Sequence, residues 1–404
     1  MADLSPLAGM PLQSLVIAGT EVSDLSPIRG MPLDYLNFAD TEVSNLSPVA
    51  GMKLTRLVSF HTNVTDLSPL KGMGLENLHF DYHAERDFEV IQSLTALNII
   101  NRRPAPEFWK AEAAIRDWKG RIRGLSEDGQ KKAVVARLKE LNPEFEEQAE
   151  SLFTFEKSVM TTLSIRTDHV SNVSFLRALP GLELLQLMKG KQIGKLADLT
   201  PLRELRLKHL DLDNNVVVDL TPLQGQPLGS LSLMGNPVSD LRPLRKAPLN
   251  QLNLWFTQVD SSALTALKGM KTLRTLNVGG TKVTDLSPIQ ELKLKTLCIT
   301  MTEIGDISPL DGTPLTNLWM ERTRVEDLSP IKGMRLQLIT FTGSPIRDIS
   351  VLRGMPLEAV KCDFDPERDA TVLRSIPTLK TINDKPAAEF WKEFDARQSR
   401  AVLR

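Results

Sequence analysis

The chain has little of several residue types on which chemistry usually depends. Its 404 residues include two cysteines, Cys298 and Cys362, and five histidines. Two cysteines exclude a disulfide framework and a cysteine-rich metal site, which is typical of a reducing compartment. The formal net charge is −1, so bulk electrostatics give no reason to expect nucleic acid or an anionic membrane as a partner.

Membrane and catalytic signatures are missing too. No apolar run is long enough to cross a bilayer, and no basic segment followed by an apolar stretch opens the chain. There is no glycine-rich phosphate loop, no HExxH, no GxSxG and no kinase HRD or DFG. We therefore expect a cytoplasmic protein with no membrane contact, no enzyme activity, no cofactor and no small-molecule substrate.

The candidate reactive side chains are few. His79, Asp81 and His83 could form a weak metal trio, but neither a cysteine nor a second carboxylate completes a set, so we expect no metal. Cys362 falls at a position predicted to be buried. Cys298 falls at an exposed strand position, and it is a weak candidate for a nucleophile.

One short phrase repeats at a regular spacing along most of the sequence. LSPLAGMPL at Leu4 returns at Leu25, Leu46 and Leu67, and similar phrases run from Leu199 to Ile349. The alternation in PLQSLVIAGTEV predicts a short half-buried strand in each unit. The proline of LSP favours a tight 3-10 turn and excludes a long helix. One such strand cannot bury its apolar face alone, so stacked units are expected to form a solenoid.

The second half of each unit matches the LxxLxLxxNxL pattern with threonine at the asparagine position, and it resembles the short leucine-rich repeats of internalin-like and SDS22-like bacterial proteins. The resemblance implies an α/β solenoid of leucine-rich repeats, with a parallel β-sheet on the concave side and 3-10 turns on the convex side. A ladder of side chains is expected to bond backbone groups of adjacent turns: Thr20, Thr41, Thr62, Asn236, Thr257, Thr281, Thr302 and Thr323.

Two similar stretches end the two repeat series. DYHAERDFEVIQSLTALNIINRRPAPEFWK ends at residue 110, and DFDPERDATVLRSIPTLKTINDKPAAEFWK ends at residue 392. Because the last turn of a solenoid exposes an apolar edge, each stretch predicts a cap made of a short helix, a last strand and a second helix. The Glu-Arg-Asp in each stretch is expected to cap and form ion pairs. The aromatic pairs expected to cover the caps are Phe108 with Trp109, and Phe390 with Trp391.

The caps predict three segments: a first array with its C-terminal cap (1–104), a helical linker (105–142) and a second array with caps at both ends (143–404). In the linker, an apolar stripe predicts a helix that stops at Gly124, and Ser126 starts another. Asn142-Pro143 predicts a third short helix through Phe145 to Leu152. The chain starts inside a repeat, for which we favour a longer array over a first turn covered by a partner.

The segment 102–139 has eleven basic and five acidic residues, a local charge of +6. Basic helices can bind phosphate backbones. Acidic residues are interspersed, however, and no aromatic stacking platform accompanies them, so a solvated helix surface is the preferred interpretation. We expect no nucleic acid partner.

The side chains that point outward from the concave sheet are not used by the fold, and tryptophan and methionine there are typical of binding hot spots. The alternative is that the tryptophan rings lie flat on neighbours in the same sheet. The predicted partner-binding residues are Trp255, Trp319, Met188, Met234, Arg206, Lys208, Asn253, Glu321 and Phe60.

The phrase DLSPLKGM, the threonine register and the terminator ending in KPAAEFWK also resemble the leucine-rich tails that follow serine/threonine kinase domains in some bacteria. The resemblance implies an interaction or regulatory module; because the kinase motifs are absent, no ATP site carries over. The predicted function is non-catalytic binding of another protein or peptide on the concave face. The alternative is a regulatory or substrate-recruiting portion of a longer kinase. An enzyme would need a deep pocket lined by residues with shifted pKa values.

Overall fold

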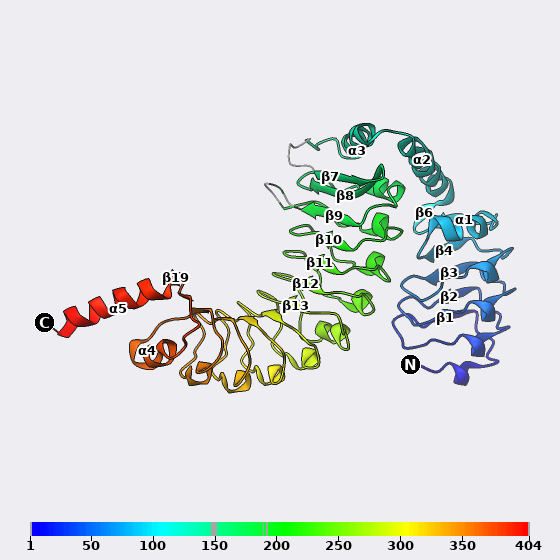
Figure 1. The fold of residues 1–404 in the computed structure, drawn as a ribbon. Coiled ribbons are helices and arrows are strands. Elements are labelled where there is room, and N and C mark those ends of the chain that lie inside the picture. Colours follow the sequence, from blue (N-terminus) through cyan, green and yellow to red (C-terminus); the bar gives the residue numbers. More distant parts are fainter. Residues whose placement is uncertain (1, 147–151, 189, 191–192, 403–404) are drawn as a thin grey trace. The chain divides into compact units, whose positions relative to one another are not determined.

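Two sheets organise the computed structural model, which describes residues 2–146, 152–188, 190 and 193–402 (Figure 1). The chain divides into two compact units, residues 1–124 and 125–404. The first sheet contains β1 (Ser14–Val16), β2 (Tyr35–Asn37), β3 (Arg56–Ser59), β4 (Asn77–Phe80), β5 (Ile99–Ile100) and β6 (Arg103–Pro104).

The second sheet has 13 strands in sequence order. They are β7 (Leu152–Glu156), β8 (Val159–Arg166), β9 (Leu184–Met188), β10 (His209–Asp211), β11 (Ser230–Ser232), β12 (Gln251–Asn253), β13 (Thr275–Asn277), β14 (Thr296–Cys298), β15 (Asn317–Trp319), β16 (Leu338–Thr340), β17 (Ala359–Lys361), β18 (Thr381–Ile382) and β19 (Lys385–Pro386). The helices are α1 (Ala84–Gln92), α2 (Ala105–Arg123), α3 (Glu127–Leu141), α4 (Pro366–Arg374) and α5 (Ala387–Val402).

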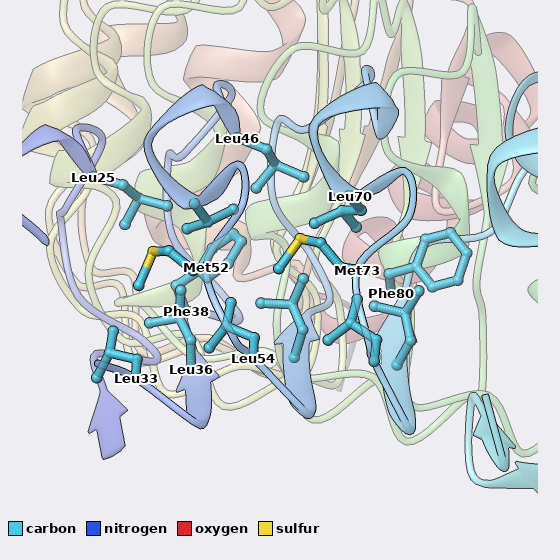
Figure 2. Packing of buried hydrophobic residues seen from close by; sticks show 14 of the residues in the cluster. Leu25, Leu33, Leu36, Phe38, Leu46, Met52, Leu54, Leu70, Met73 and Phe80 are labelled. Atoms are coloured by element: carbon cyan, nitrogen blue, oxygen red, sulfur yellow. The ribbon is translucent and has the colours of Figure 1, made fainter. Parts of the chain in front are cut away.

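Each repeat adds one parallel strand in the same register. In the first array Leu15 lies opposite Leu36, Leu36 opposite Leu57, and Leu57 opposite Leu78. These leucines are buried, and Figure 2 shows how leucine, methionine and phenylalanine side chains of successive turns pack behind the strands. Burial of one such side chain contributes about 1.5–3 kcal/mol, so stacking supplies the stability that a single turn lacks. The predicted α/β leucine-rich repeat solenoid is confirmed.

Short 3-10 turns connect the strands, and in Figure 1 they lie on the outer side of the second array's curve, with the strands inside. An acidic or amide side chain two residues before most turns caps them: Asp24 Oδ1 accepts the Ser26 N–H at 2.8 Å, and Asn45 Oδ1 accepts that of Ser47 at 2.9 Å. The bonds from Ser26 hold the pKa of Asp24 below its ordinary value. The 3-10 turns are Ser5–Leu7, Ser26–Ile28, Ser47–Val49, Ser68–Leu70, Ser174–Ala178, Thr200–Leu202, Thr221–Leu223, Arg242–Leu244, Ala263–Leu267, Ser287–Ile289, Ser308–Leu310, Ser329–Ile331 and Ser350–Leu352.

The predicted threonine ladder is wrong in its partners. Each hydroxyl donates to the carbonyl three residues earlier in its own turn, as Thr41 does to Phe38 at 2.7 Å; Thr20, Thr62, Thr257, Thr281, Thr302 and Thr323 do the same. The longer amide reaches the preceding turn: Asn236 Nδ2 donates to the Leu212 carbonyl at 2.8 Å, and its Oδ1 accepts the Val217 N–H at 3.0 Å. These threonine hydroxyls therefore bond mainly within their own turn, although Thr323 also bonds the Ser344 hydroxyl of the following turn at 3.0 Å, and asparagine ties two turns together.

The two caps repeat each other closely. Asp87 is buried and accepts from Arg86 Nε at 2.5 Å and from the His83 N–H at 2.8 Å; its twin Asp369 accepts from Arg368 and the Asp365 N–H at the same distances. A two-residue turn at positive φ then adds an antiparallel strand, β6 or β19, where the sequence predicts a simple break at proline. Proline on this last strand leaves no N–H for further pairing.

Aromatic side chains cover both caps. Phe108 is 6% exposed and packs edge-on against Tyr82 at 5.0 Å and Trp109 at 5.2 Å. In the second cap Phe390 and Trp391 are half-buried; their centroids lie 5.2 Å apart, and Phe364 lies 5.0 Å from Phe390.

The helices between the arrays divide between the two units. α2 ends at Gly124 and belongs to the first unit, and α3 begins after Ser126, whose hydroxyl accepts the Gly129 N–H at 3.2 Å. The third short helix is wrong at both described ends, because Phe145 lies in a turn and Leu152 starts β7. The side chain of Asn142 caps the end of α3 and bonds the backbone at residues 171–172, so it does not start a helix; residues 147–151 lie outside the described part.

Candidate protein-binding face

We define the concave face as the outward side chains of the second array from β9 to β17. They are the residues that strand pairing aligns with Asp211, together with the residue two positions after each: Gln186, Met188, Asp211, Asp213, Ser232, Met234, Asn253, Trp255, Asn277, Gly279, Cys298, Thr300, Trp319, Glu321, Thr340, Thr342, Lys361 and Asp363. The buried core lies on the other side of these strands, so the fold does not require most of these side chains.

The placement of Arg206 and Lys208 on this face is wrong. β10 runs from His209 to Asp211, and Asp211 lies opposite Gln186 and Ser232. The stretch LRLKHLDL contains both LRL and LDL, so alternation alone fits two registers. Arg206 and Lys208 precede the strand, and Lys208 Nζ forms an ion pair with Glu183 at 2.7 Å.

Asp211 and Asp213 take the outward positions instead, and sequence reasoning missed both. Counting would have found them, because β10 starts ten residues after Leu199 as β11 starts ten residues after Leu220. Burial raises the pKa of Asp211 to about 6. The hydrogen bond from the Asp213 N–H, at 3.0 Å, lowers this pKa, and the negative charge of Asp213 raises it. Burial also raises the pKa of Asp213. Within the described chain, neither carboxylate forms an ion pair.

A chain of hydrogen bonds crosses three strands from Asp213 to Trp255. Asp213 Oδ1 accepts from Ser232 Oγ at 2.5 Å and from the Met234 N–H at 2.9 Å. Asn253 Nδ2 donates to Ser232 Oγ at 2.9 Å, and its Oδ1 accepts the Trp255 N–H at 3.1 Å. The predicted site residue Asn253 therefore holds the polar side chains of this face in place.

Two adjacent aromatic rings lie over two adjacent glycines. A Cβ at Gly279 would lie 2.8 Å from the Trp255 ring, and one at Gly280 would lie 2.5 Å from the Phe256 ring. The rings are edge-on at 5.5 Å. Trp255 is half-buried, whereas Phe256 stays 48% exposed. The ring of Trp255 packs on Gly279 of the next repeat, which agrees with the alternative that the tryptophan rings pack on neighbours in the same sheet. Phe256 is an additional apolar side chain that sequence reasoning missed.

The other predicted residues of the face lie along the same sheet. Trp319 is half-buried in β15, opposite Cys298 and Thr340. Glu321 accepts the Thr300 hydroxyl at 2.7 Å. Met188, at the end of β9, and Met234 are half-buried. The structure thus brings Met234, Asn253 and Trp255 together, while Trp319 and Glu321 lie three strands beyond β12.

Both cysteines are buried, although only Cys362 was expected to be. Cys298 points outward but is only 8% exposed, and burial raises the pKa of its thiol. Burial also raises the pKa of Cys362 to about 12, as its predicted core position requires. The expectation that Cys298 is exposed is wrong, because large neighbours such as Trp319 flank this strand position.

In the first array, the predicted residue Phe60 is half-buried between two histidine rings, at 5.9 Å from His61 and 6.0 Å from His79. His79 Nδ1 accepts the Arg102 N–H at 3.2 Å, and Asp81 accepts that of His61 at 2.6 Å. Across the described residues, no three His, Cys, Asp or Glu side chains form a group that could hold a metal ion.

A cavity of about 540 Å³ lies between adjacent turns of the second array, lined by Asp311–Thr316, Lys332–Arg335, Gln337 and Pro356. Its lining contains neither Asp211 nor Asp213, so the hollow and the shifted carboxylates do not coincide. The combination that would suggest an active site is therefore not present at this cavity.

Several basic residues of the segment 102–139 form ion pairs: Lys119 with Glu85, Arg121 with Asp117, Lys132 with Asp128, and Arg137 with Glu140. Arg116 lies over the Phe88 ring at 4.0 Å. In the part of the chain that the structure describes, no helix is long and apolar enough to cross a membrane.

The regular repeat, the parallel register and the 3-10 turns define a leucine-rich repeat protein. No protein-family model matches the chain, and no curated protein matches it. Among solved structures, it is similar to the internalin InlF of Listeria monocytogenes, at 21% identity over 93% of this chain and 87% of that one, with a TM-score of 0.46. It is also similar to InlC2 of the same organism (23% identity, 50% and 80% covered, TM-score 0.38) and to the functional domain of its InlJ (15% identity, 92% and 62% covered, TM-score 0.39).

Proposed function

We propose that this chain is a non-catalytic protein–protein interaction module that binds a partner on the concave face. One observation carries the proposal: Met188, Met234, Trp255 and Trp319 stand half-buried on a face that lies opposite the completed leucine core. Large apolar side chains that keep solvent contact lose that contact favourably when a partner covers them.

The chemistry of the face favours recognition. Tryptophan is enriched among interface residues whose truncation costs about 2 kcal/mol or more. Half-buried tryptophans supply contact area with few rotamers to lose, and Asn253 already fixes the backbone at Trp255 through its bond to that N–H.

The test compares pull-downs with the intact protein and with the Trp255→Ala/Trp319→Ala variant. We expect the variant to stay folded and to lose the partners that the intact protein recovers. Val218→Ala is the matched control, because Val218 is 57% exposed and lies outside the concave face. Equal recovery of the same partners by intact protein and double variant would contradict binding at this face.

Trp391→Ala provides a contrast from the cap. Trp391 packs against Phe390 and Phe394 at 5.2 and 5.9 Å, so its loss should lower the stability of the second array, whereas the concave variants should not. A large loss of stability in the Trp255→Ala/Trp319→Ala variant would make these two rings structural.

Two accompanying proposals have separate tests. A cytoplasmic location is tested by fractionation of the native host. The alternative function, a regulatory or substrate-recruiting portion of a longer bacterial serine/threonine kinase, is tested by the coding sequence upstream: an in-frame kinase domain would establish it.

A further inference from the structure

We propose that the concave face takes a basic segment of the partner protein, which sets a lysine or arginine against Asp211 and Asp213 and apolar side chains against Met234, Trp255 and Phe256. The proposal rests on the proposed function, since it names the chemistry of the partner for the same face.

The described charged side chains of the face are acidic, with no basic ones, where the aromatic side chains lie. Among the described residues from β9 to β13, the concave face carries two carboxylates and no lysine or arginine, with His209 at the start of β10 as a further titratable group. Outside these strands, Arg166 lies at the end of β8, and Lys361 in β17 forms an ion pair with Asp384 at 2.7 Å. Positive charge on a partner is therefore complementary to the described part of this region.

In each carboxylate, Oδ1 accepts hydrogen bonds and Oδ2 accepts none from the described residues. Asp211 Oδ1 accepts the Asp213 N–H, and Asp213 Oδ1 accepts from Ser232 and Met234. For both residues, no partner of Oδ2 exists among the described side chains and backbone. These fixed orientations spare a binding cation the entropy of ordering the acceptors.

The apolar part of the site is within reach of the same ligand segment. Asp213 and Trp255 are two strands apart, which is about 10 Å at the usual strand spacing. An extended lysine or arginine side chain is shorter than that distance, so its stem would lie on Met234, one strand from Asp213, with its charged end at the carboxylates, and a neighbouring apolar residue of the segment would cover Trp255. The exposed edge of Phe256 then extends the contact beyond Trp255.

The raised pKa values of both aspartates support this geometry. Their charges are partly desolvated, and no cation of the described residues pairs with them, so a cation from the partner supplies the missing interaction.

The experiment is a selection of random 12-residue peptides displayed on phage against the intact protein. The selected peptides are then measured by fluorescence anisotropy with four proteins: wild type, Trp255→Ala/Trp319→Ala, Asp211→Asn/Asp213→Asn, and Glu291→Gln/Glu326→Gln. The last variant removes the same charge from exposed positions off the face. Asparagine keeps Oδ1 as an acceptor, so the hydrogen bonds of the free protein remain.

We expect the selected peptides to share a lysine or arginine beside apolar residues. Their affinity should fall at least tenfold in the aspartate variant and stay within twofold in the glutamate control. Raising the salt from 50 to 500 mM should weaken binding to the wild type and have less effect on the aspartate variant.

Two other outcomes overturn the inference, and they are distinguishable. Peptides that lose affinity with Trp255→Ala/Trp319→Ala but keep it with Asp211→Asn/Asp213→Asn would leave the concave face as the binding site and refute a basic partner. A selection in which no peptide depends on Trp255, Trp319 or the aspartates would refute both the basic partner and the proposed function.

Discussion

Replacement of Asp211 by asparagine should stabilise the protein at neutral pH. Burial raises the pKa of Asp211 from an ordinary 3.8 to about 6, so ionisation costs more in the folded than in the unfolded state. A rise of that size corresponds to about 3 kcal/mol at most. Asp211 retains solvent contact, and screening reduces this to about 1 kcal/mol. The introduced asparagine amide would keep an acceptor for the Asp213 N–H.

The pH dependence has a definite sign. Below pH 3.8 the carboxyl of Asp211 is neutral in both the folded and the unfolded state, so it does not lower the free energy of unfolding. Because its pKa is raised in the folded state, the free energy of unfolding falls as the pH rises, and the loss is complete above about pH 6. The advantage of Asp211→Asn should therefore be near zero at pH 4 and about 1 kcal/mol at pH 7.5.

Urea unfolding at both pH values, followed by tryptophan fluorescence, measures the difference between variant and wild type. Asp285→Asn is the matched control: it removes one charge from a turn-capping position that Asn45 occupies naturally in another repeat. Bonds from Ser287 lower the pKa of Asp285, so this substitution should not stabilise the protein at pH 7.5. The reasoning is refuted if Asp211→Asn is less stable than wild type at pH 7.5, or if its advantage is the same at both pH values.

Two further predictions concern groups that hold the turns together. Asp369→Ala leaves the Arg368 guanidinium without its buried partner and should destabilise the second array by about 3–5 kcal/mol in urea unfolding; a loss below about 1 kcal/mol would contradict this role. Asn236→Ala leaves the Val217 N–H unpaired and removes one of the two amide donors to the Leu212 carbonyl, which Asn215 still bonds, so it should cost about 2 kcal/mol, whereas Asn236→Thr should cost less because threonine can bond within its own turn. Equal losses for the two substitutions at position 236 would refute the bridging role.

The repeated elements could be predicted because nearly every unit carries the same pattern of a proline turn followed by an alternating strand. The spacing of Leu4, Leu25 and Leu46 fixes one strand and one turn per repeat, and the structure has them there. Partners across turns were not predictable from spacing, because a threonine hydroxyl and an asparagine amide occupy one position but reach different distances. The start of the third helix was mispredicted because Asn142 bonds backbone groups far along the chain, which no local pattern reveals.

The candidate site depended on register more than on residue type. Trp255 and Met234 were found because an aromatic or a methionine stands out on a strand that otherwise alternates leucine with polar residues. Asp211 and Asp213 were missed because LRL, which begins at Leu205, alternates as well as LDL, which begins at Leu210. The shift of the Asp211 pKa comes from burial against neighbouring strands, which belong to other repeats and cannot be read from the local sequence.

The short antiparallel strand that ends each sheet limits where a further repeat can be added to an array. Arg103–Pro104 and Lys385–Pro386 end their sheets with a proline, so a new unit added after either strand would meet an edge that cannot accept it. Copying a single repeat can extend an array only ahead of its cap. Copying an array together with its terminator would give a chain with two arrays that each end in EFWK, as this chain has.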